Sequence, residues 1–190
     1  MKSLRELYKV GRGPSSSHTM GPEKASKYFL SVTPEADSYE VILYGSLSAT
    51  GKGHRTDAAI EETIAPKPVK IVFDTTTPSS TLPHANTMDF IAYKDGKEIL
   101  RTRILSVGGG AIHIEGQKDV EPEEIYKENT FSEIAALCKA KKIRLSDYVF
   151  ETEGPEIRHF LYDIWQVMKE EIQGGLTTSG VLPGGLNVPH

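Results

Sequence analysis

Cysteine is nearly absent from this sequence of 190 residues, which contains only Cys138. A single thiol excludes an internal disulfide framework and a thiolate metal cluster built from this chain alone, and it suits a reducing compartment. No apolar run approaches the roughly 20 residues that a membrane span requires. The first ten residues are charged and lack the apolar core of a signal peptide. We therefore expect a cytoplasmic protein without a membrane partner.

An excess of positive charge is also missing. Lysine and arginine number 22, aspartate and glutamate 26, and the formal net charge is −4 at pH 7. Nucleic-acid-binding domains usually carry a basic face, so we expect no nucleic acid among the partners. The hydrophobic fraction of 38% and the charged fraction of 25% are typical of globular proteins. The length suffices for one core, or for one domain and part of another.

The most distinctive stretch is residues 11–22, with the sequence GRGPSSSHTMGP. Its Gly and Pro content argues against the interior of a helix or strand and predicts a loop. Hydroxyl groups and an imidazole on such a loop suit binding or catalysis, whereas the alternative interpretation is a flexible Ser-rich linker. Gly21 and Pro22 favour a helix start, where free amide groups and the helix dipole attract anions such as a carboxylate.

Hydrophobic periodicity predicts the elements that follow. Helices are expected over residues 3–9, 21–32, 56–64 and 131–143, the last opened by a capping box from Thr130 to Glu133. Strands are expected over residues 39–45, 69–74, 87–94, 97–107 and 111–115, and residues 46–55 are expected to form a Gly-rich turn. Asp95-Gly96 predicts a two-residue hairpin, and the Gly triplet at residues 108–110 predicts a bulge or a close backbone approach. The order predicts an α+β domain with a mixed or antiparallel sheet.

The composition changes near residue 146. Ser146 is a candidate cap for a short helix, and residues 157–173 carry a long apolar stripe that Gly174-Gly175 is expected to end. A helix this apolar needs a partner surface. We therefore expect a second, helical domain that begins near residue 146 and is mostly absent from this chain or lies on another one.

Two histidines, His18 and His54, each lie in a Gly-bounded segment directly before a predicted helix. This repeated context suggests one shared site, although two exposed loop histidines would show the same pattern. His113 alternates with apolar residues and is expected to be structural, while His84 and Asn86 are weaker candidates for polar contacts. No pair has the i, i+4 spacing of a helical zinc site, so we expect no metal ligands here.

Five motifs together resemble the iron–sulfur-dependent L-serine dehydratases. They are GPSSSHTMGP at residues 13–22, GKGHRTD at 51–57, PHANTM at 83–88, SVGGG at 106–110 and GVLPGGL at 180–186. The third departs slightly from the family's His-Pro-Asn-Thr-Met. Their order and spacing cover nearly the whole chain, which makes the resemblance much more specific than any single motif.

The resemblance implies both fold and activity. Residues 1–145 would form the family's β domain, similar to the allosteric substrate-binding domain of phosphoglycerate dehydrogenase. Residues 146–190 would be a linker and the first helix of a truncated all-α catalytic domain. The family converts L-serine to pyruvate and ammonia with a [4Fe–4S] cluster and without pyridoxal phosphate. The implied partners are L-serine, the α domain or subunit, and further copies of the chain in a homo-oligomer.

The resemblance also implies roles for residues. His54 is carried over as the general base, because an imidazole titrates near neutral pH, and His18 as a second catalytic residue. The implied substrate-binding residues are Ser15, Ser16, Ser17, Thr19 and Asn86. Because a cluster needs several thiolates, we expect this chain to be inactive by itself. The alternative hypothesis is a non-catalytic regulatory module that binds serine or another small anion.

Overall fold

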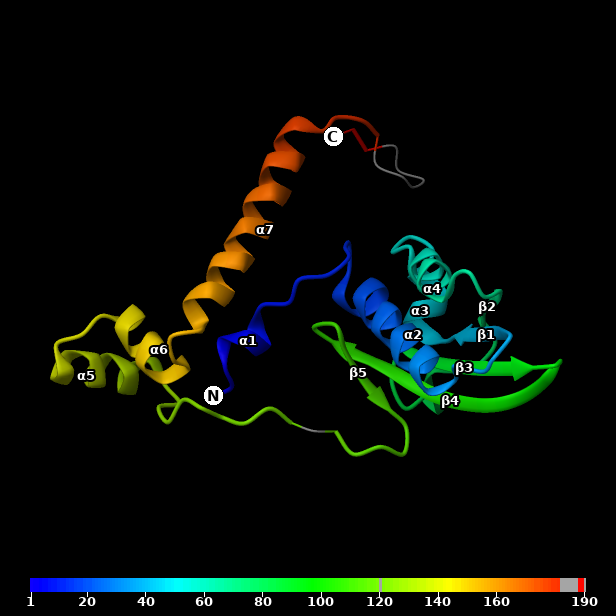
Figure 1. Ribbon diagram of the computed structural model, residues 1–190, viewed down its shortest axis with the longest axis horizontal. Helices are drawn as coiled ribbons and strands as arrows, with labels where there is room; N and C mark the ends of the chain where they lie inside the picture. The colour runs from blue at the N-terminus through cyan, green and yellow to red at the C-terminus, as the bar shows by residue number, and fades with distance from the viewer. Residues whose placement is uncertain (120, 182–187, 190) are drawn as a thin grey trace. The chain divides into compact units, whose positions relative to one another are not determined.

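The computed structural model describes residues 1–119, 121–181 and 188–189. The contacts divide the chain into two compact units, one formed by Gly11–Asp119 and the other by Met1–Val10 together with Val120–His190 (Figure 1). The described residues form helices and a mixed sheet, so the α+β class is confirmed. The boundary expected near residue 146 concerns the family's domains and stays a prediction.

The described strands form one five-stranded sheet in the unit of residues 11–119. Their order across the sheet is β2-β1-β3-β4-β5, in which β1 and β2 are parallel and the other pairs antiparallel. The strands are β1 (Ser38–Leu43), β2 (Val69–Phe73), β3 (Thr87–Lys94), β4 (Lys97–Gly108) and β5 (Ala111–Ile114). All five lie where the hydrophobic pattern predicts strands.

Both predicted turn signals are confirmed. Asp95 and Gly96 have φ angles of 49° and 73°, as the tight hairpin turn between β3 and β4 requires. The register between β4 and β5 shifts between Ser106 and Gly108, which is the expected bulge. Three consecutive positive φ angles at residues 108–110 then turn the chain into β5, a backbone path that favours glycine.

Two helices cover the apolar face of this sheet, α2 (Gly21–Val32) and α4 (Thr56–Ile64). Phe29 on α2 packs against Phe90 of β3, with ring centroids 5.4 Å apart. Ile60 on α4 joins the same fully buried cluster. Because each such side chain contributes about 1.5–3 kcal/mol when fully buried, this layer anchors both helices to the sheet.

Strand β3 is more deeply buried than its alternating pattern predicts, since every residue from 87 to 92 is buried. On the outer face Asp89 accepts hydrogen bonds from Arg103 at 2.7 and 2.8 Å and from the Tyr44 hydroxyl at 3.0 Å. Ile91 lies between its cross-strand partners Glu40 and Arg101. The half-buried prediction was wrong because a central strand is flanked by long polar side chains on its outer face.

Two segments that we expected to be loops are helical. Residues Ser16–Met20 form a π-helix that runs directly into α2, and Gly45–Thr50 form the helix α3. In addition, a 3₁₀ turn at Ser79–Thr81 interrupts the hydroxyl-rich loop before β3. The contacts that stabilise the first two helices come from distant parts of the chain and are described with the site.

The second unit contains α1 (Leu4–Leu7), α5 (Phe131–Lys141), α6 (Leu145–Glu153) and α7 (Ile157–Thr177). The capping box at the start of α5 is confirmed. Ser146 lies inside α6 instead of capping it, because Asp147 accepts a hydrogen bond from the Arg144 amide. Helix α7 also continues through Gly174 and Gly175, where we expected it to end; glycine costs about 1 kcal/mol in a helix but does not terminate it.

Glu153 ties residues 1–10 to the helices of this unit. Its carboxylate accepts hydrogen bonds from the Ser3 hydroxyl at 2.6 Å, the Leu4 amide at 2.7 Å and the Tyr126 hydroxyl at 2.7 Å. Burial, and then the bond to Glu153, raise the pKa of Tyr126. The first residues of the chain thus belong to the helical unit, although the sequence between them and residue 120 forms the sheet unit.

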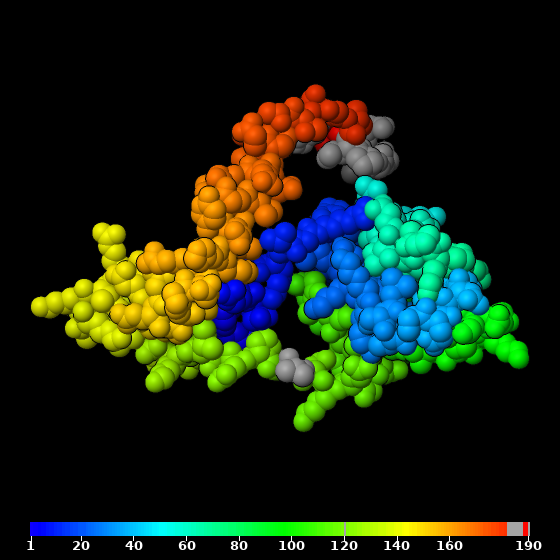
Figure 2. Space-filling model, in the orientation of Figure 1, coloured from blue at the N-terminus to red at the C-terminus, as the bar shows by residue number. Residues whose placement is uncertain are grey.

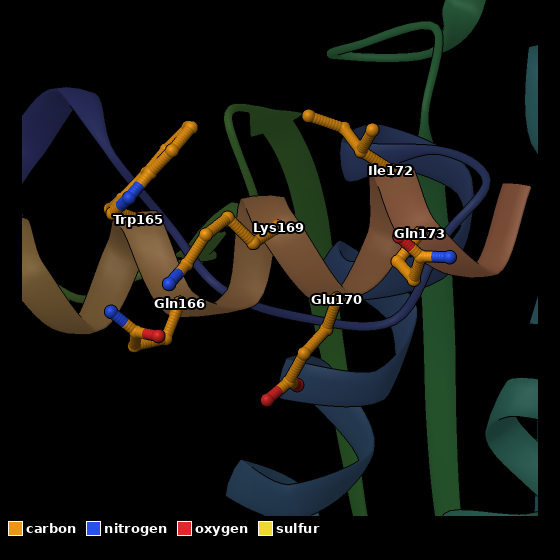
Figure 3. A pocket seen from close by; sticks show the side chains of 6 residues that line it. All are labelled: Trp165, Gln166, Lys169, Glu170, Ile172 and Gln173. Carbon is orange, nitrogen blue, oxygen red and sulfur yellow. The ribbon is translucent and has the colours of Figure 1, made fainter. Parts of the chain in front are cut away.

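Within its own unit, α7 leaves much of its surface uncovered. Only its first half supplies buried side chains, Ile157 and Ile164, and Trp165 and Ile172 are about half exposed. Figure 2 shows the surface of this helix in orange. The side chains drawn in Figure 3 all come from α7 and mix apolar with polar groups. In the part of the chain that the structure describes, no helix combines the length and hydrophobicity needed to cross a bilayer.

We predict that the outer-face network around Asp89 stabilises the sheet unit. The Asp89→Asn variant should lose about 1–3 kcal/mol of unfolding free energy, because it leaves the partly buried Arg103 guanidinium without its carboxylate. The matched control is Glu98→Gln, which breaks an exposed pair with Arg101 on the same strand and should cost about 0.5 kcal/mol or less. Hydrogen exchange at β3 and β4 amides measures both. Equal losses in the two variants would contradict the assignment.

Candidate active site

The first part of the site is a widened helical turn, Ser16–Met20, that leads into Gly21 and Pro22 of α2. Ser15 caps the turn by accepting the His18 amide on its hydroxyl, and its carbonyl accepts from the Thr19 and Met20 amides. Pro22 has no N–H and therefore donates to none of the carbonyls of this turn. The carbonyl groups of Ser17 and His18 accept hydrogen bonds from elsewhere in the chain.

Two distant hydroxyl groups satisfy these carbonyls. Ser106 Oγ on β4 donates to the Ser17 carbonyl at 2.8 Å, and Thr56 Oγ1 at the start of α4 donates to the His18 carbonyl at 2.6 Å. Both donors are fully buried, where an unpaired polar group would cost about 1–3 kcal/mol. The first motif is thus hydrogen-bonded to the second and the fourth.

Gly21 allows this close approach. A Cβ atom at Gly21 would lie 2.1 Å from Ser106 Oγ and 2.9 Å from Ser106 Cβ. The Ser106 main chain in turn bonds to Asn86, whose carbonyl accepts from the Ser106 amide at 2.9 Å and whose side-chain Nδ2 donates to the Ser106 carbonyl at 3.3 Å. Ser106 therefore links the third motif to the first.

Helix α3 links the third motif to the first. The Ser46 amide donates to the Ala85 carbonyl at 2.8 Å. Gly45 has a φ angle of +54°, and a Cβ atom there would lie 2.5 Å from the Ala85 oxygen. The side chain of Ser46 reaches the imidazole of His18, with Oγ and Nε2 3.0 Å apart. Four of the five motifs thus converge on one region of the sheet unit.

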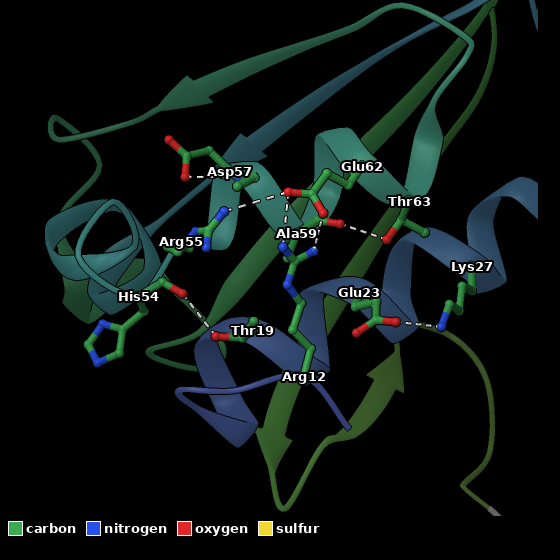
Figure 4. A network of polar contacts seen from close by, with 11 residues as sticks. Arg12, Thr19, Glu23, Lys27, His54, Arg55, Asp57, Ala59, Glu62 and Thr63 are labelled. Carbon is green, nitrogen blue, oxygen red and sulfur yellow. Dashed lines mark hydrogen bonds and ion pairs between the residues drawn. The ribbon is translucent and has the colours of Figure 1, made fainter. Parts of the chain in front are cut away.

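His54 lies at the end of the turn between α3 and α4, half-buried. Its Nδ1 is 3.0 Å from the Thr50 carbonyl, which can only accept, so Nδ1 carries the proton and Nε2 carries the lone pair. Thr19 Oγ1 donates to the His54 carbonyl at 2.9 Å (Figure 4). The main chain and the ring of His54 are both held, and Nε2 is the atom able to accept a proton.

His18 lies beside His54, with ring centroids 4.7 Å apart and planes tilted by 38°. Burial lowers the pKa of His18, and the neighbouring His54 lowers it further, while a backbone hydrogen bond at Ser46 opposes them. At neutral pH His18 is therefore an uncharged imidazole. The structure brings together the two histidines that the sequence pattern singled out.

The hydroxyl and amide residues expected to bind substrate take different positions. Ser15 and Ser17 are half-buried, and Ser17 Oγ lies 2.9 Å from His18 Nδ1. Ser16 is exposed on the first turn. Thr19 is fully buried and directed to the His54 main chain. Asn86 is half-buried against Ser106.

An ion-pair cluster fixes the chain just before the widened turn. Arg12 binds Glu62 on α4 with both guanidinium nitrogens, at 2.6 and 2.9 Å, and Arg55 lies 3.7 Å from the same carboxylate (Figure 4). The hydrogen bond from Arg12 lowers the pKa of Glu62. The segment that leads into the first motif is thus attached to the helix that follows His54.

Comparison with known proteins assigns the family. Residues 3–74 match the family model described as the serine dehydratase beta chain. Over 100% of its length the chain is 35% identical to L-serine dehydratase TdcG of Escherichia coli and 31% identical to the L-serine dehydratase of Haemophilus influenzae. It is 32% identical to the L-serine dehydratase of Streptomyces coelicolor over 98% of its length.

Residues 3–74 belong to the serine dehydratase beta-chain family. The chain covers 52% of each of these three relatives, so it spans about half the length of the curated proteins that it matches. The family that the five sequence motifs suggested is therefore confirmed. The fifth motif, at residues 180–186, lies largely outside the described residues.

The beta-chain residues do not fit an iron–sulfur cluster, which takes several cysteine thiolates. The one cysteine, Cys138, is a half-buried residue of α5. Across residues 1–119, 121–181 and 188–189, no three His, Cys, Asp or Glu side chains are grouped so as to hold a metal ion.

Three hydroxyl residues of this serine dehydratase domain were missed by sequence reasoning: Ser46, Thr56 and Ser106. Thr56 and Ser106 belong to recognised motifs, and that membership was the available signal. Ser46 lies five residues before the second motif in a segment expected to be a turn, and its role emerges only from its contact with His18.

We predict that Gly21 is indispensable to the widened turn. In the Gly21→Ala variant the new methyl group overlaps Ser106, so the sheet unit should lose about 1–3 kcal/mol. Gly53→Ala is the control, because its Cβ would meet only the Thr50 oxygen at an ordinary 3.4 Å. Hydrogen exchange at β4 amides compares the two variants. A Gly21→Ala domain as stable as Gly53→Ala would show that Ser106 has room to move.

We predict that His18 of the beta domain titrates below the ordinary histidine pKa of about 6.5. Because the unfolded chain then binds a proton first, His18 should destabilise the fold as pH falls from about 6.5 through the lower folded pKa. NMR titration of the full chain measures this. His54→Gln should raise the pKa of His18, whereas His113→Gln, a change on β5, should leave it unchanged; a His18 that titrates at or above 6.5 would contradict the burial assignment.

Proposed function

We propose that this chain supplies the β-domain half of an L-serine dehydratase, which converts L-serine to pyruvate and ammonia. The observation that carries the proposal is the His54–His18 pair, built by four interlinked motifs in a chain that matches L-serine dehydratases along its whole length. The [4Fe–4S] cluster of such an enzyme would be held by cysteines outside this chain.

His54 is the proposed general base. Its Nε2 lone pair would take the α-proton of serine, and hydroxide would leave from the β-carbon to give aminoacrylate. That enamine tautomerises to an imine, which water hydrolyses to pyruvate and ammonia, so the water lost in the first stage is regained in the second. The α-proton is far less acidic than an imidazolium, so His54 requires electrostatic stabilisation of the developing negative charge.

The widened turn is the proposed binding element for substrate. The first amide groups of a helix have no intrahelical partner and attract a carboxylate, and Ser16 and Ser17 lie on that first turn. Ser15 would contribute by capping the turn, and Asn86 would contribute by its hydrogen bond to Ser106. Thr19 would act through His54, whose carbonyl it binds.

The remaining proposals concern the assembly. The sheet unit would resemble the allosteric substrate-binding domain of phosphoglycerate dehydrogenase, and the segment from residue 146 would begin the all-α catalytic domain. The uncovered apolar side chains of α7 support a helix that packs against further α-domain structure. We propose a cytoplasmic homo-oligomer without pyridoxal phosphate. Similarity to named dehydratases favours this function over a purely regulatory module.

The test is to combine the chain with a cysteine-bearing α domain without oxygen and to measure pyruvate formed from L-serine. We expect turnover from the mixture, and His54→Ala should reduce it by about 10²–10⁴-fold, the usual contribution of a general base.

The matched control replaces a histidine outside the site: His113→Gln should retain nearly full activity. A His54→Ala mixture as active as the unmodified one would refute the base assignment. Saturable serine binding with no turnover in any mixture would instead favour the regulatory module.

A further inference from the structure

Ser46 occupies the first turn of α3, and all its polar groups are engaged. Its amide donates to the Ala85 carbonyl at 2.8 Å, and its carbonyl accepts from Thr50 Oγ1 at 2.9 Å. Its Oγ lies 3.0 Å from His18 Nε2. The hydroxyl oxygen is therefore held in place by a main chain that is bonded on both sides.

The imidazole of His18 is hydrogen-bonded at both nitrogens. Ser17 Oγ lies 2.9 Å from Nδ1, and Ser46 is at Nε2. A neutral imidazole has one N–H donor and one acceptor nitrogen, and a hydroxyl group can pair with either. The two serine hydroxyls therefore hold the ring between them, one as donor and the other as acceptor.

We infer that Ser46 is a positioning residue of the site, which together with Ser17 holds His18 in one tautomer and fixes its ring against His54. The catalytic meaning of this inference rests on the proposed function, whereas the contact between Ser46 and His18 does not depend on it. Neither the motifs nor the family comparison assigns this residue a role.

The arrangement matters because the two rings are only 4.7 Å apart. Two imidazolium ions at that distance would repel each other strongly in a partly buried site. A His18 that is locked as a neutral tautomer leaves His54 as the group that gains and loses the proton. A His18 ring free to turn or to exchange tautomers would weaken both the contact and this division of roles.

The experiment uses the full 190-residue chain labelled with ¹⁵N, and it reads the ring nitrogens of His18 by long-range ¹H–¹⁵N NMR. We expect one dominant tautomer in the unmodified chain. Ser46→Ala should give averaged nitrogen shifts from exchanging tautomers, and Ser46→Thr, which keeps a hydroxyl group, should restore the single tautomer. If Ser46→Ala does not fold, Ser46→Cys, with a similar volume and a much weaker hydrogen-bonding group, carries the same test.

Ser48→Ala is the matched control, because Ser48 lies on the same helix and its Oγ has no partner among the described residues. It should leave the His18 signals unchanged. An unchanged tautomer in Ser46→Ala, or an equal change in Ser48→Ala, would overturn the inference. In the α-domain mixture, Ser46→Ala should lower pyruvate formation by about tenfold. If the unmodified mixture forms no pyruvate, the proposed function is refuted, but the tautomer result still stands.

Discussion

The structure of this site depends on two hydrogen bonds to the carbonyls of the widened turn. Pro22, which has no N–H, cannot donate to either of them. Ser106 donates to the Ser17 carbonyl and Thr56 to the His18 carbonyl. These two bonds connect the widened turn to a sheet strand and to a second helix. They hold the segment that carries His18 against the start of α4, which directly follows the turn that carries His54.

The two histidines differ in the groups that orient them. His54 faces a main-chain carbonyl, which fixes its proton on Nδ1 and leaves Nε2 open. His18 lies between two hydroxyl groups in a buried position that disfavours its charged form. The ring of His54 thus presents a free Nε2, while burial disfavours the charged form of His18. The sheet also fixes the start of α3, because Asp89 on β3 accepts a hydrogen bond from Tyr44, the residue that precedes this helix.

The sequence predicts the sheet well and the site only in part. Strands such as β1 and the hairpin at Asp95-Gly96 follow from local patterns that burial reinforces. The π-helix at Ser16–Met20 could not be predicted, because its carbonyls are satisfied by residues up to 89 positions away. Helix α3 could not be predicted for a similar reason. Its first residue, Gly45, is required because the Ala85 carbonyl leaves no room for a Cβ atom, and local helix propensity carries no information on this distant contact.

Under the proposed function, the chain would provide the general base of an active site whose remaining groups would lie in an α domain. The most direct measurement is a crystal structure of the chain assembled with that domain and bound to L-serine or an unreactive analogue. The ligand's α-carbon is expected next to His54 Nε2, with its carboxylate at the widened turn. A ligand bound away from both histidines would contradict it.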